Sequence, residues 1–564
     1  MQIKSLINSA IKEAFSAVDI MPKTTEVSEA TKAEFGDFQY NGAMALAKEL
    51  KQNPRDIAQK LASKLEENEL FSKVEVAGPG FINLTISSQF LSKNILNALD
   101  SRAGVDKKSD SIKVVVDYSS PNMAKQMHVG HLRSSVIGDA IANLFEFLGD
   151  SVIRQNHIGD WGTQFGMLIA YFEENQADAQ TKLSDLEQFY KEAKKQFDQS
   201  EEFANKARQY VVKLQSGDKE CLSLWRTFID KTLEHCQAVY DALGVGLNNS
   251  HVRGESAYND ALEAIVKELE SKNIAKESQG AKCIFFDDSQ NPLIIQKQDG
   301  GFLYATTDLA AIKYRVQELG AKRVCYVVDA RQAEHFKQVF QTAKLAGFAN
   351  EDTILEHIAF GMVLDKSGRP FKTRDGGTVK LKDLIDEAVA RAKEVISKAN
   401  EYSADELEEI ANAVGVGSLK YADLSINRQS NYIFDWDKML TLDGNTALYM
   451  QYAYARINSI LQKAGDLKEV EPTINDDLER RLALKILSLD DTLNRAYKEA
   501  MPHLIATYLY ELAGLFMRFY ENNPILKDGV KESTKNSRLI LAKACANAIK
   551  VALNILGIKV LDRI

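Results

Sequence analysis

The sequence predicts a multidomain α/β protein, in which a parallel-sheet domain with a helical insertion lies between a small α+β domain and an all-α domain. Three observations support this class. The chain has 564 residues, which is too long for a single hydrophobic core. Its middle contains short, nearly continuous apolar runs, typical of strands buried on both faces of a sheet. Its last part, 441–564, has helical periodicity throughout.

The first part, residues 1–105, alternates helix-like segments with one expected strand. The segment "FGDFQYNGAMALAKEL", 35–50, reads as a loop followed by an amphipathic helix. The strand is expected within "KVEVAGPGFINLTIS", 73–87. No cluster of catalytic residue types occurs here, and we expect a small α+β domain.

The middle part, 106–440, has the pattern of a parallel sheet covered by helices. Four apolar runs lead into polar loops and are separated by helix-periodic segments, which is typical of repeated β-α units. They are "IKVVVDY" (112–118), "SVIRQNHIG" (151–159), "RVCYVVDA" (323–330) and "HIAFGMVL" (357–364). A long polar helical stretch, about 173–276, interrupts the series and is expected to be an insertion.

The last part, 441–564, is expected to be all-helical. Its clearest amphipathic segments are "NTALYMQYAYARINSILQKAG" (445–465) and "SRLILAKACANAIKVALNILGI" (537–558). The whole chain carries a net charge of -9, which argues against a general nucleic-acid binder. From residue 527 onward, however, eight Lys/Arg face three Asp/Glu. By composition alone this basic tail reads as a solvated helix face.

Cysteine content and hydropathy indicate the setting. Five cysteines lie far apart with no C-x-x-C pair, so we expect reduced, buried thiols and no structural zinc. No run of about 18 apolar residues occurs, and the first helix-like segment has polar residues throughout. These features predict a cytoplasmic protein without a membrane partner.

Two histidines mark the most informative stretch, "SSPNMAKQMHVGHLRSSVIGDAIANLFEFLG", residues 119–149. His128 and His131 flank Gly130 where the first sheet strand leads into a helix. Ligands of parallel sheets bind at the carboxyl ends of the strands, and helix amino termini favour phosphate. Histidine N–H groups suit phosphate oxygens, and a glycine lets a flat base approach the backbone. Ordinary packing and zinc binding remain alternatives, although zinc would need further ligands.

The surroundings of these histidines make the motif far more specific. "VVVDYSSPNMAKQMHVGHLRSSVIGDA" followed by "VIRQNHIGDWGTQFGMLIA" resembles the class I aminoacyl-tRNA synthetases, and most closely the arginyl-tRNA synthetase family of bacterial type. The resemblance extends from "GDFQYNGAMALAK" and "AGPGFIN" to "GGFLYATTDLAA", "YVVDARQAEHF", "KYADLSINRQSNYIFDWDKML" and "GNTALYMQYAYARI". It covers nearly the whole chain and implies a Rossmann-type catalytic domain.

The resemblance implies a two-step reaction. ATP and L-arginine would form arginyl-adenylate and pyrophosphate, and the arginyl group would pass to the 3′ terminal ribose of tRNA(Arg), releasing AMP. His128, Gly130 and His131 would hold ATP, and the two histidines would stabilise the transition state. Such chemistry depends mainly on positioning and on donors aimed at the phosphate charge. Mg²⁺ is expected to accompany ATP.

Arginine selection requires acceptors for a planar, permanently charged guanidinium, and carboxylates meet this need best. Asp117 ends the first sheet strand, and Asp308 follows Tyr304 by one helical turn. The resemblance implies that Asp117 and Asn122 lie near the substrate, and that Tyr304, Asp308 and Gln332 line the arginine pocket. From the residues alone, an aspartate near a helix start can simply be a cap.

The chain departs from the class in its second signature, usually K-M-S-K-S. The corresponding segment, "PFKTRDGG" (370–377), has no lysine at the second lysine position. Lys372 and Arg374 lie nearby and are expected to contribute to ATP binding. We also predict that Lys125, three residues before His128, supplies the compensating charge, since a lysine is a compact cation on a flexible stem.

The flanking domains resemble the tRNA-contacting N-terminal domain and the anticodon-binding domain of the family. With this resemblance the basic tail is expected to bind RNA through a local patch. Lys543, Asn547, Lys550 and Asn554 are spaced to share one helix face, and Lys543 and Lys550 are predicted to bind tRNA. The family further implies a monomer.

Two other functions fit parts of the sequence. A small-molecule adenylyltransferase would share the H-x-G-H site and the fold, but it would not need the helical domain 441–564. A non-catalytic tRNA-binding paralogue would be expected to lose signature residues, whereas both histidines and both pocket aspartates are present.

Overall fold

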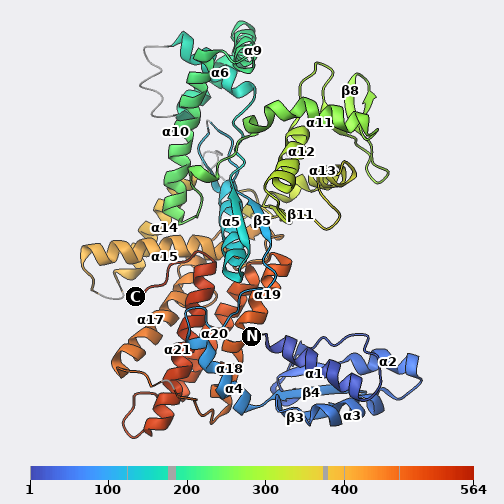
Figure 1. Cartoon of the computed structure of the whole chain (residues 1–564). Coiled ribbons are helices and arrows are strands. Elements are labelled where there is room, and N and C mark those ends of the chain that lie inside the picture. The colour runs from blue at the N-terminus through green and yellow to red at the C-terminus, as the bar shows by residue number, and fades with distance from the viewer. Residues whose placement is uncertain (1, 124, 176–185, 372–378, 399–400, 469) are drawn as a thin grey trace.

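The computed structural model describes residues 2–123, 125–175, 186–371, 379–398, 401–468 and 470–564. They form a small mixed domain near the N-terminus, a central parallel sheet with a projecting helical arm, and a helical body (Figure 1). This arrangement confirms the predicted multidomain α/β class. No helix in these ranges is both long and apolar enough to cross a membrane.

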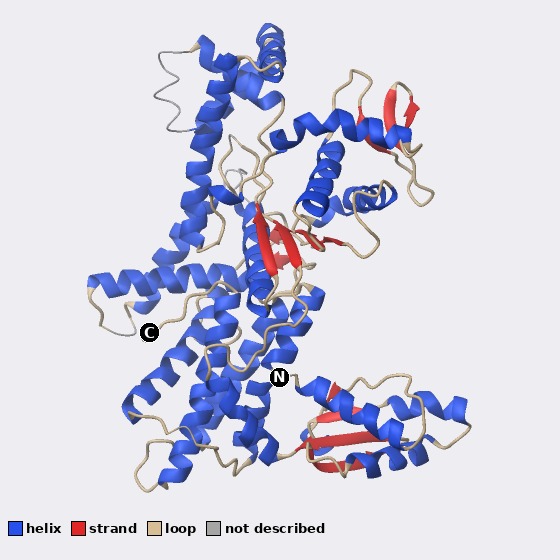
Figure 2. Cartoon of the chain, viewed as in Figure 1, coloured by secondary structure: helices blue, strands red, loops and turns tan. Residues whose placement is uncertain are grey.

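The N-terminal domain packs helices on an antiparallel sheet of order β1-β2-β4-β3 (Figure 2). The single strand predicted within 73–87 is a hairpin of two strands, because Gly78 and Gly80 turn the chain at φ 52° and 133°. The elements are α1 (Ile3–Ala17), β1 (Ser28–Glu29), η1 (Ala33–Phe35), β2 (Phe38–Tyr40), α2 (Gly42–Leu50), α3 (Pro54–Leu65), β3 (Phe71–Ala77), β4 (Phe81–Ile86), α4 (Ser88–Ile95) and η2 (Leu96–Leu99).

The central sheet has the order β11-β10-β5-β6 with all neighbours parallel. Val114 and Val116 pack on the α5 side, whereas Val115 packs with α12 and α13. Strand β5 is therefore buried on both faces, as its apolar run predicts. The elements are β5 (Lys113–Asp117), α5 (Val129–Leu148), β6 (Ser151–Gln155), α12 (Tyr304–Lys313), η5 (Tyr314–Glu318), β10 (Arg323–Tyr326), η6 (Ala330–Gln332), α13 (Ala333–Leu345) and β11 (Ile354–His357).

The prediction of a strand over residues 357–364 is wrong. Strand β11 ends at His357, and the N–H of Gly361 donates to the carbonyl of Arg428, 2.9 Å away. This bond to a distant segment draws the chain away from the sheet. An apolar run in the sequence gives no sign of such a bond. Two short strands pair in parallel beyond it, β12 (Val363–Leu364) and β13 (Tyr432–Ile433).

A helical insertion lies between β6 and β10, as the predicted fold class requires, and part of it projects as an arm (Figure 1). The arm consists of α6 (Thr163–Glu174), α8 (Leu186–Gln199), α9 (Glu201–Gln215) and α10 (Lys219–Leu243). The chain then continues through η3 (Asn249–His251) and η4 (Glu255–Tyr258) to α11 (Asn259–Ser271), which packs with α12 (Figure 1). A small antiparallel sheet that follows it was not predicted, because its strands are short and partly exposed. They are β7 (Lys276–Ser278), β8 (Ala281–Ile284) and β9 (Leu293–Gln296).

The remaining helices form the body of the molecule, and the predicted all-α C-terminal part is confirmed. One hydrophobic cluster runs from the N-terminal domain through α5 to α21. The elements are α14 (Leu381–Ile396), α15 (Ala404–Leu424), α16 (Trp436–Met439), α17 (Ala447–Ala464), α18 (Asp477–Leu487), α19 (Leu489–Glu499), α20 (His503–Asn522) and α21 (Glu532–Ile555).

An ion pair fastens the N-terminal domain to this body. The guanidinium of Arg480 in α18 donates to both carboxylate oxygens of Asp37, at 2.8 and 2.5 Å, and also to the carbonyl of Ile86. Asp37 in turn accepts from the N–H of Ile86. A bidentate, largely buried pair fixes orientation as well as distance.

Candidate active site

The predicted site residues gather at the carboxyl edge of the central sheet. Asp117 ends β5, and the loop that follows carries Asn122 and Lys125 before α5 begins. Tyr304 and Asp308 lie on α12, and Gln332 directly precedes α13. Three crossover segments therefore deliver residues that are distant in sequence to one edge, where ligands of parallel sheets bind.

The two histidines form the first turn of α5. The N–H of Gly130 donates to Nδ1 of His128 (3.0 Å), and the N–H of His128 donates to Nδ1 of His131 (3.1 Å). The rings lie 4.1 Å apart between centroids. Because each Nδ1 accepts a backbone N–H, each neutral ring carries its proton on Nε2.

Electrostatics keep both rings neutral. Burial and then the neighbouring His128 lower the pKa of His131 to about 3, although a backbone hydrogen bond opposes this. Burial and the charge of Lys125 lower the pKa of His128. The pair can therefore offer two N–H donors to phosphate oxygens without a positive charge of its own.

Metal binding fits these histidines less well. Within the described ranges, no group of three or more His, Cys, Asp or Glu side chains could hold a metal ion. All five cysteines are buried and unpaired with one another. Both histidines also use Nδ1 to cap the helix, so only Nε2 of each ring is left for a ligand.

A local contact that the sequence did not reveal explains why position 130 is a glycine. A Cβ at this position would lie 2.8 Å from Cε1 and 2.9 Å from Nδ1 of His128. Any side chain would displace the first histidine ring, which explains the glycine of H-x-G-H without a ligand. The contact between Gly130 and adenine stays a prediction.

Of the three cations predicted near the phosphates, the structure describes only Lys125. Lys125 is exposed, and its Nζ lies 5.0 Å from the ring centroid of Tyr190 in α8. Its charge reaches His128, as the lowered pKa of that ring indicates. Lys372 and Arg374 lie outside the described residues.

Asp117 is already occupied by partners within the protein. Its carboxylate accepts from Nη2 of Arg315 at 2.7 Å and from Oγ of Ser120 at 2.9 Å. Both Asp117 and Arg315 are buried. Asp117 was predicted to lie near the substrate, and the contacts show that it also joins η5 to the turn after β5.

The other pocket residues are joined by His335, which the sequence analysis missed. Nε2 of His335 lies 2.6 Å from Oδ2 of Asp308, and its ring centroid lies 4.6 Å from that of Tyr304. Tyr304 is 60% exposed, and Gln332 is also exposed. The segment "RQAEHF" held a usable signal, because Gln332 and His335 share one turn at the start of α13.

Two acidic residues near Asp308, Asp160 and Glu255, were also missed by the sequence analysis. Burial, followed by repulsion from Asp160 and Asp308, raises the pKa of Glu255 to about 7. Asp160 accepts from the N–H and hydroxyl of Ser256. For the Glu255 side chain, the described part of the chain supplies no hydrogen-bond or ion-pair partner. Glu255 is thus a half-buried acid whose pKa lies close to neutral pH.

The polar face of α21 is only partly open to solvent. It consists of Lys543, Asn547, Lys550 and Asn554. Nδ2 of Asn547 points at the carbonyls of Ala98, Leu99 and Asp100, at 3.1, 2.8 and 3.2 Å. Lys543 is half-buried, and Lys550 is exposed. The centre of this face therefore holds the segment after η2, and tRNA binding by Lys543 and Lys550 stays a prediction.

Comparisons with known proteins agree with this geometry. A family model described as tRNA synthetases class I (R), catalytic domain, matches residues 94–436. Models for the DALR anticodon binding domain and the arginyl tRNA synthetase N terminal domain match residues 450–564 and 1–86.

Full-length relatives support the same assignment. The chain is 50% identical to the arginine–tRNA ligase of Chromobacterium violaceum, with 100% of both chains covered. The arginyl-tRNA synthetase of Plasmodium falciparum is 30% identical with a TM-score of 0.88, again over 100% of both chains. The Thermus thermophilus structure, at 24% identity and a TM-score of 0.85, shares the fold over 100% of both chains. This chain belongs to the arginyl-tRNA synthetase family of class I aminoacyl-tRNA synthetases.

Proposed function

We propose that the chain is an arginine–tRNA ligase. A carboxylate oxygen of arginine attacks the α-phosphorus of ATP, the bond to pyrophosphate breaks, and arginyl-adenylate forms. A hydroxyl of the terminal ribose of tRNA(Arg) then attacks the activated carbonyl, and AMP leaves. The observation that carries the proposal is the juxtaposition, at one sheet edge, of two neutral N–H donors and the carboxylates of Asp308 and Glu255.

On the phosphate side, Nε2–H of His128 and of His131 would donate to oxygens that gain charge during the attack. Fixed donors of this kind stabilise the transition state because they need no reorganisation. Lys125, Lys372 and Arg374 would offset the charge of the departing pyrophosphate. Mg²⁺ would be held by the phosphates of ATP and by water, since the described residues offer it no protein cage.

On the amino-acid side, Asp308 and Glu255 would accept the guanidinium N–H groups while Tyr304 packs against its plane. Carboxylates match the fork of N–H donors on a guanidinium. Asn122 and Gln332 would contact the rest of the substrate. Asp117 would act through Arg315 and the following turn.

The tRNA would be bound by the flanking domains, with Lys543 and Lys550 contributing to its phosphates. A monomeric state and a cytoplasmic location are further parts of the proposal. Charging of total tRNA with each of the twenty labelled amino acids tests the function. Arginine alone should be transferred, and transfer of a different amino acid, or of none, would contradict it.

Asp308→Asn should raise the KM for arginine by about 10²- to 10⁴-fold and leave the KM for ATP nearly unchanged. Removing one partner of a desolvated charge pair costs roughly 3 to 5 kcal/mol. Steady-state arginine activation, with each substrate varied in turn, measures both constants. An unchanged arginine dependence would remove Asp308 from the pocket.

Glu255 should make arginine recognition pH-dependent. Its pKa is raised to about 7, and only the ionised form attracts a guanidinium, so kcat/KM for arginine should rise as the pH rises. From pH 6 to pH 8 the gain should be about tenfold. Glu255→Gln should lower kcat/KM and flatten this part of the profile. A profile of unchanged shape in that variant would assign the titration to a different group.

Lys125→Ala should slow arginine activation by roughly 10²-fold or more, with arginine affinity and tRNA binding nearly intact. Single-turnover formation of the adenylate measures the step. Lys194→Ala is a matched control, because Lys194 is also an exposed lysine over an aromatic ring of the arm, that of Phe197. A rate within about threefold of the parent would transfer the role to Lys372 or Arg374.

Changing Lys543 and Lys550 together to alanine should weaken tRNA binding. The slope of log affinity against log salt should flatten by up to about two units, because each phosphate contact releases about one counterion. The double change to arginine keeps both charges and should keep the slope. Equal affinity and slope in the alanine and arginine variants would make this part of α21 a solvated face.

A further inference from the structure

Two consecutive serines adopt an uncommon backbone conformation beside the site. Ser119 and Ser120 have φ values of 71° and 44°, in the left-handed region that disfavours residues with a Cβ. They form the turn between Asp117 and the loop with Asn122 and Lys125. A strained turn persists only where its surroundings hold it, and such turns concentrate at functional sites.

Side chains from two other segments hold the turn. The N–H of Ser119 donates to Oγ of Ser134 in α5 at 2.9 Å. The N–H of Ser120 donates to Oδ1 of Asn156, just after β6, at 3.0 Å. Both bonds use the backbone of the turn, so they favour this conformation directly.

One hydroxyl connects these supports. The Tyr240 hydroxyl on α10 accepts from Nδ2 of Asn156 at 3.0 Å and lies 2.7 Å from Oγ of Ser119. Because it accepts from Asn156, its own proton can be given to Ser119. Tyr240 is 2% exposed, so water does not replace these bonds if the hydroxyl is lost.

We propose that Tyr240 is a positioning residue for arginine activation. Its hydroxyl keeps the Ser119–Ser120 turn in the left-handed conformation and thereby places the loop that carries Asn122 and Lys125. The inference rests on the proposed function of that loop and adds a residue of the arm that touches no substrate.

The end of α10 is fixed firmly enough for this role. Nζ of Lys420 donates to the carbonyls of Leu243 and Gly244, at 3.0 and 3.2 Å, where α10 ends. The N–H of Gly246 donates to Asp139 on α5 at 2.8 Å. A helix end held at three backbone groups gives Tyr240 a defined position.

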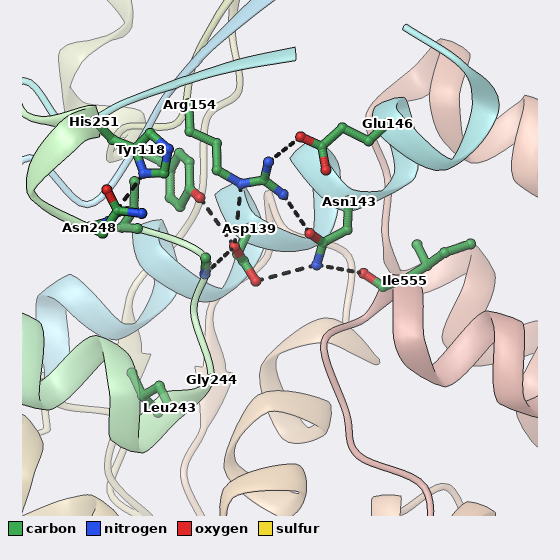
Figure 3. Close-up of polar contacts among 12 residues, drawn as sticks. Tyr118, Asp139, Asn143, Glu146, Arg154, Leu243, Gly244, Asn248, His251 and Ile555 are labelled. Carbon is green, nitrogen blue, oxygen red and sulfur yellow. Dashed lines mark hydrogen bonds and ion pairs between the residues drawn. The ribbon is translucent and has the colours of Figure 1, made fainter. Parts of the chain in front are cut away.

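The same carboxylate also holds the residue before the turn. The Tyr118 hydroxyl donates to Oδ1 of Asp139 at 3.1 Å (Figure 3). Asn143 donates both to Asp139 and to the carbonyl of Ile555, at the end of α21 (Figure 3). The strained turn and the helix that supports it are thus anchored to one point of α5.

Tyr240→Phe removes the hydroxyl and keeps the ring. We expect kcat/KM for arginine activation to fall by about 5- to 30-fold, because two buried polar groups lose a partner. At saturating arginine, kcat should fall less, because bound substrate can select the correct turn. Single-turnover and steady-state activation, with tRNA present in every assay, separate these effects.

Tyr508→Phe is the matched control. Tyr508 is also 2% exposed, and its hydroxyl donates to the carbonyl of Ile486 at 3.3 Å within the C-terminal helices. The control should lose a similar amount of thermal stability and retain activation. If Tyr240→Phe loses no more activity than this control, the inference is overturned.

Ser119→Gly supplies a rescue that a general structural role would not show. Glycine adopts positive φ without strain, so the turn no longer needs the hydroxyl. In the Tyr240→Phe background it should restore kcat/KM by at least about threefold, whereas alone it should have little effect. Absence of rescue, with a melting temperature lowered in step with activity, overturns the inference.

The loop's own role is tested separately. Asn122→Ala should lower arginine activation by itself. If Asn122→Ala is impaired and Tyr240→Phe is not, only the positioning role fails. If both Asn122→Ala and Lys125→Ala are fully active, the proposed role of the loop fails, and the Tyr240 inference falls with it.

Discussion

The buried carboxylate of Asp139 is the interaction on which the placement of the site depends. A charge inside a protein is stable only when donors and opposite charges surround it. Here the surroundings come from the turn after β5, the segment after α10 and the side chain of Asn143, with Arg154 4.0 Å away (Figure 3). Helix α5, which begins with the two histidines, is thereby fixed relative to its neighbours along its middle turns.

A second buried pair fixes α5 nearer to its histidines. Nε of Arg133 donates to both oxygens of Asp423 on α15, at 3.2 and 3.0 Å, and both side chains are almost fully buried. At the opposite edge of the sheet, Tyr497 of α19 bonds Lys108 and Asp150, each at 2.6 Å. The catalytic sheet and the C-terminal helices therefore share polar anchors as well as one hydrophobic core, and a displacement of one would disturb the other.

The histidines and the carboxylates of the candidate site differ in how their charges are balanced. At the start of α5, burial keeps the two histidines neutral, so each can donate a hydrogen bond without carrying a positive charge. Around Asp308, by contrast, Arg315 neutralises Asp117 and His335 contacts Asp308, whereas the Glu255 side chain has no hydrogen-bond or ion-pair partner among the described residues. Burial, followed by repulsion from Asp160 and Asp308, raises the pKa of Glu255, and a cation bound beside it would lower this pKa again.

The sequence by itself determined the fold class, the order of the domains, and the histidine pair at the start of α5. Those features depend on local patterns: apolar runs, helical periodicity and a short motif whose glycine and histidines contact one another. The tertiary structure decided the rest. Glu255 and Tyr240 carry no local signal, and Asn547 bonds a segment far away in sequence. The charge of a buried group and the strain of a turn depend on the sum of neighbours from several elements, and only the folded chain brings those neighbours together.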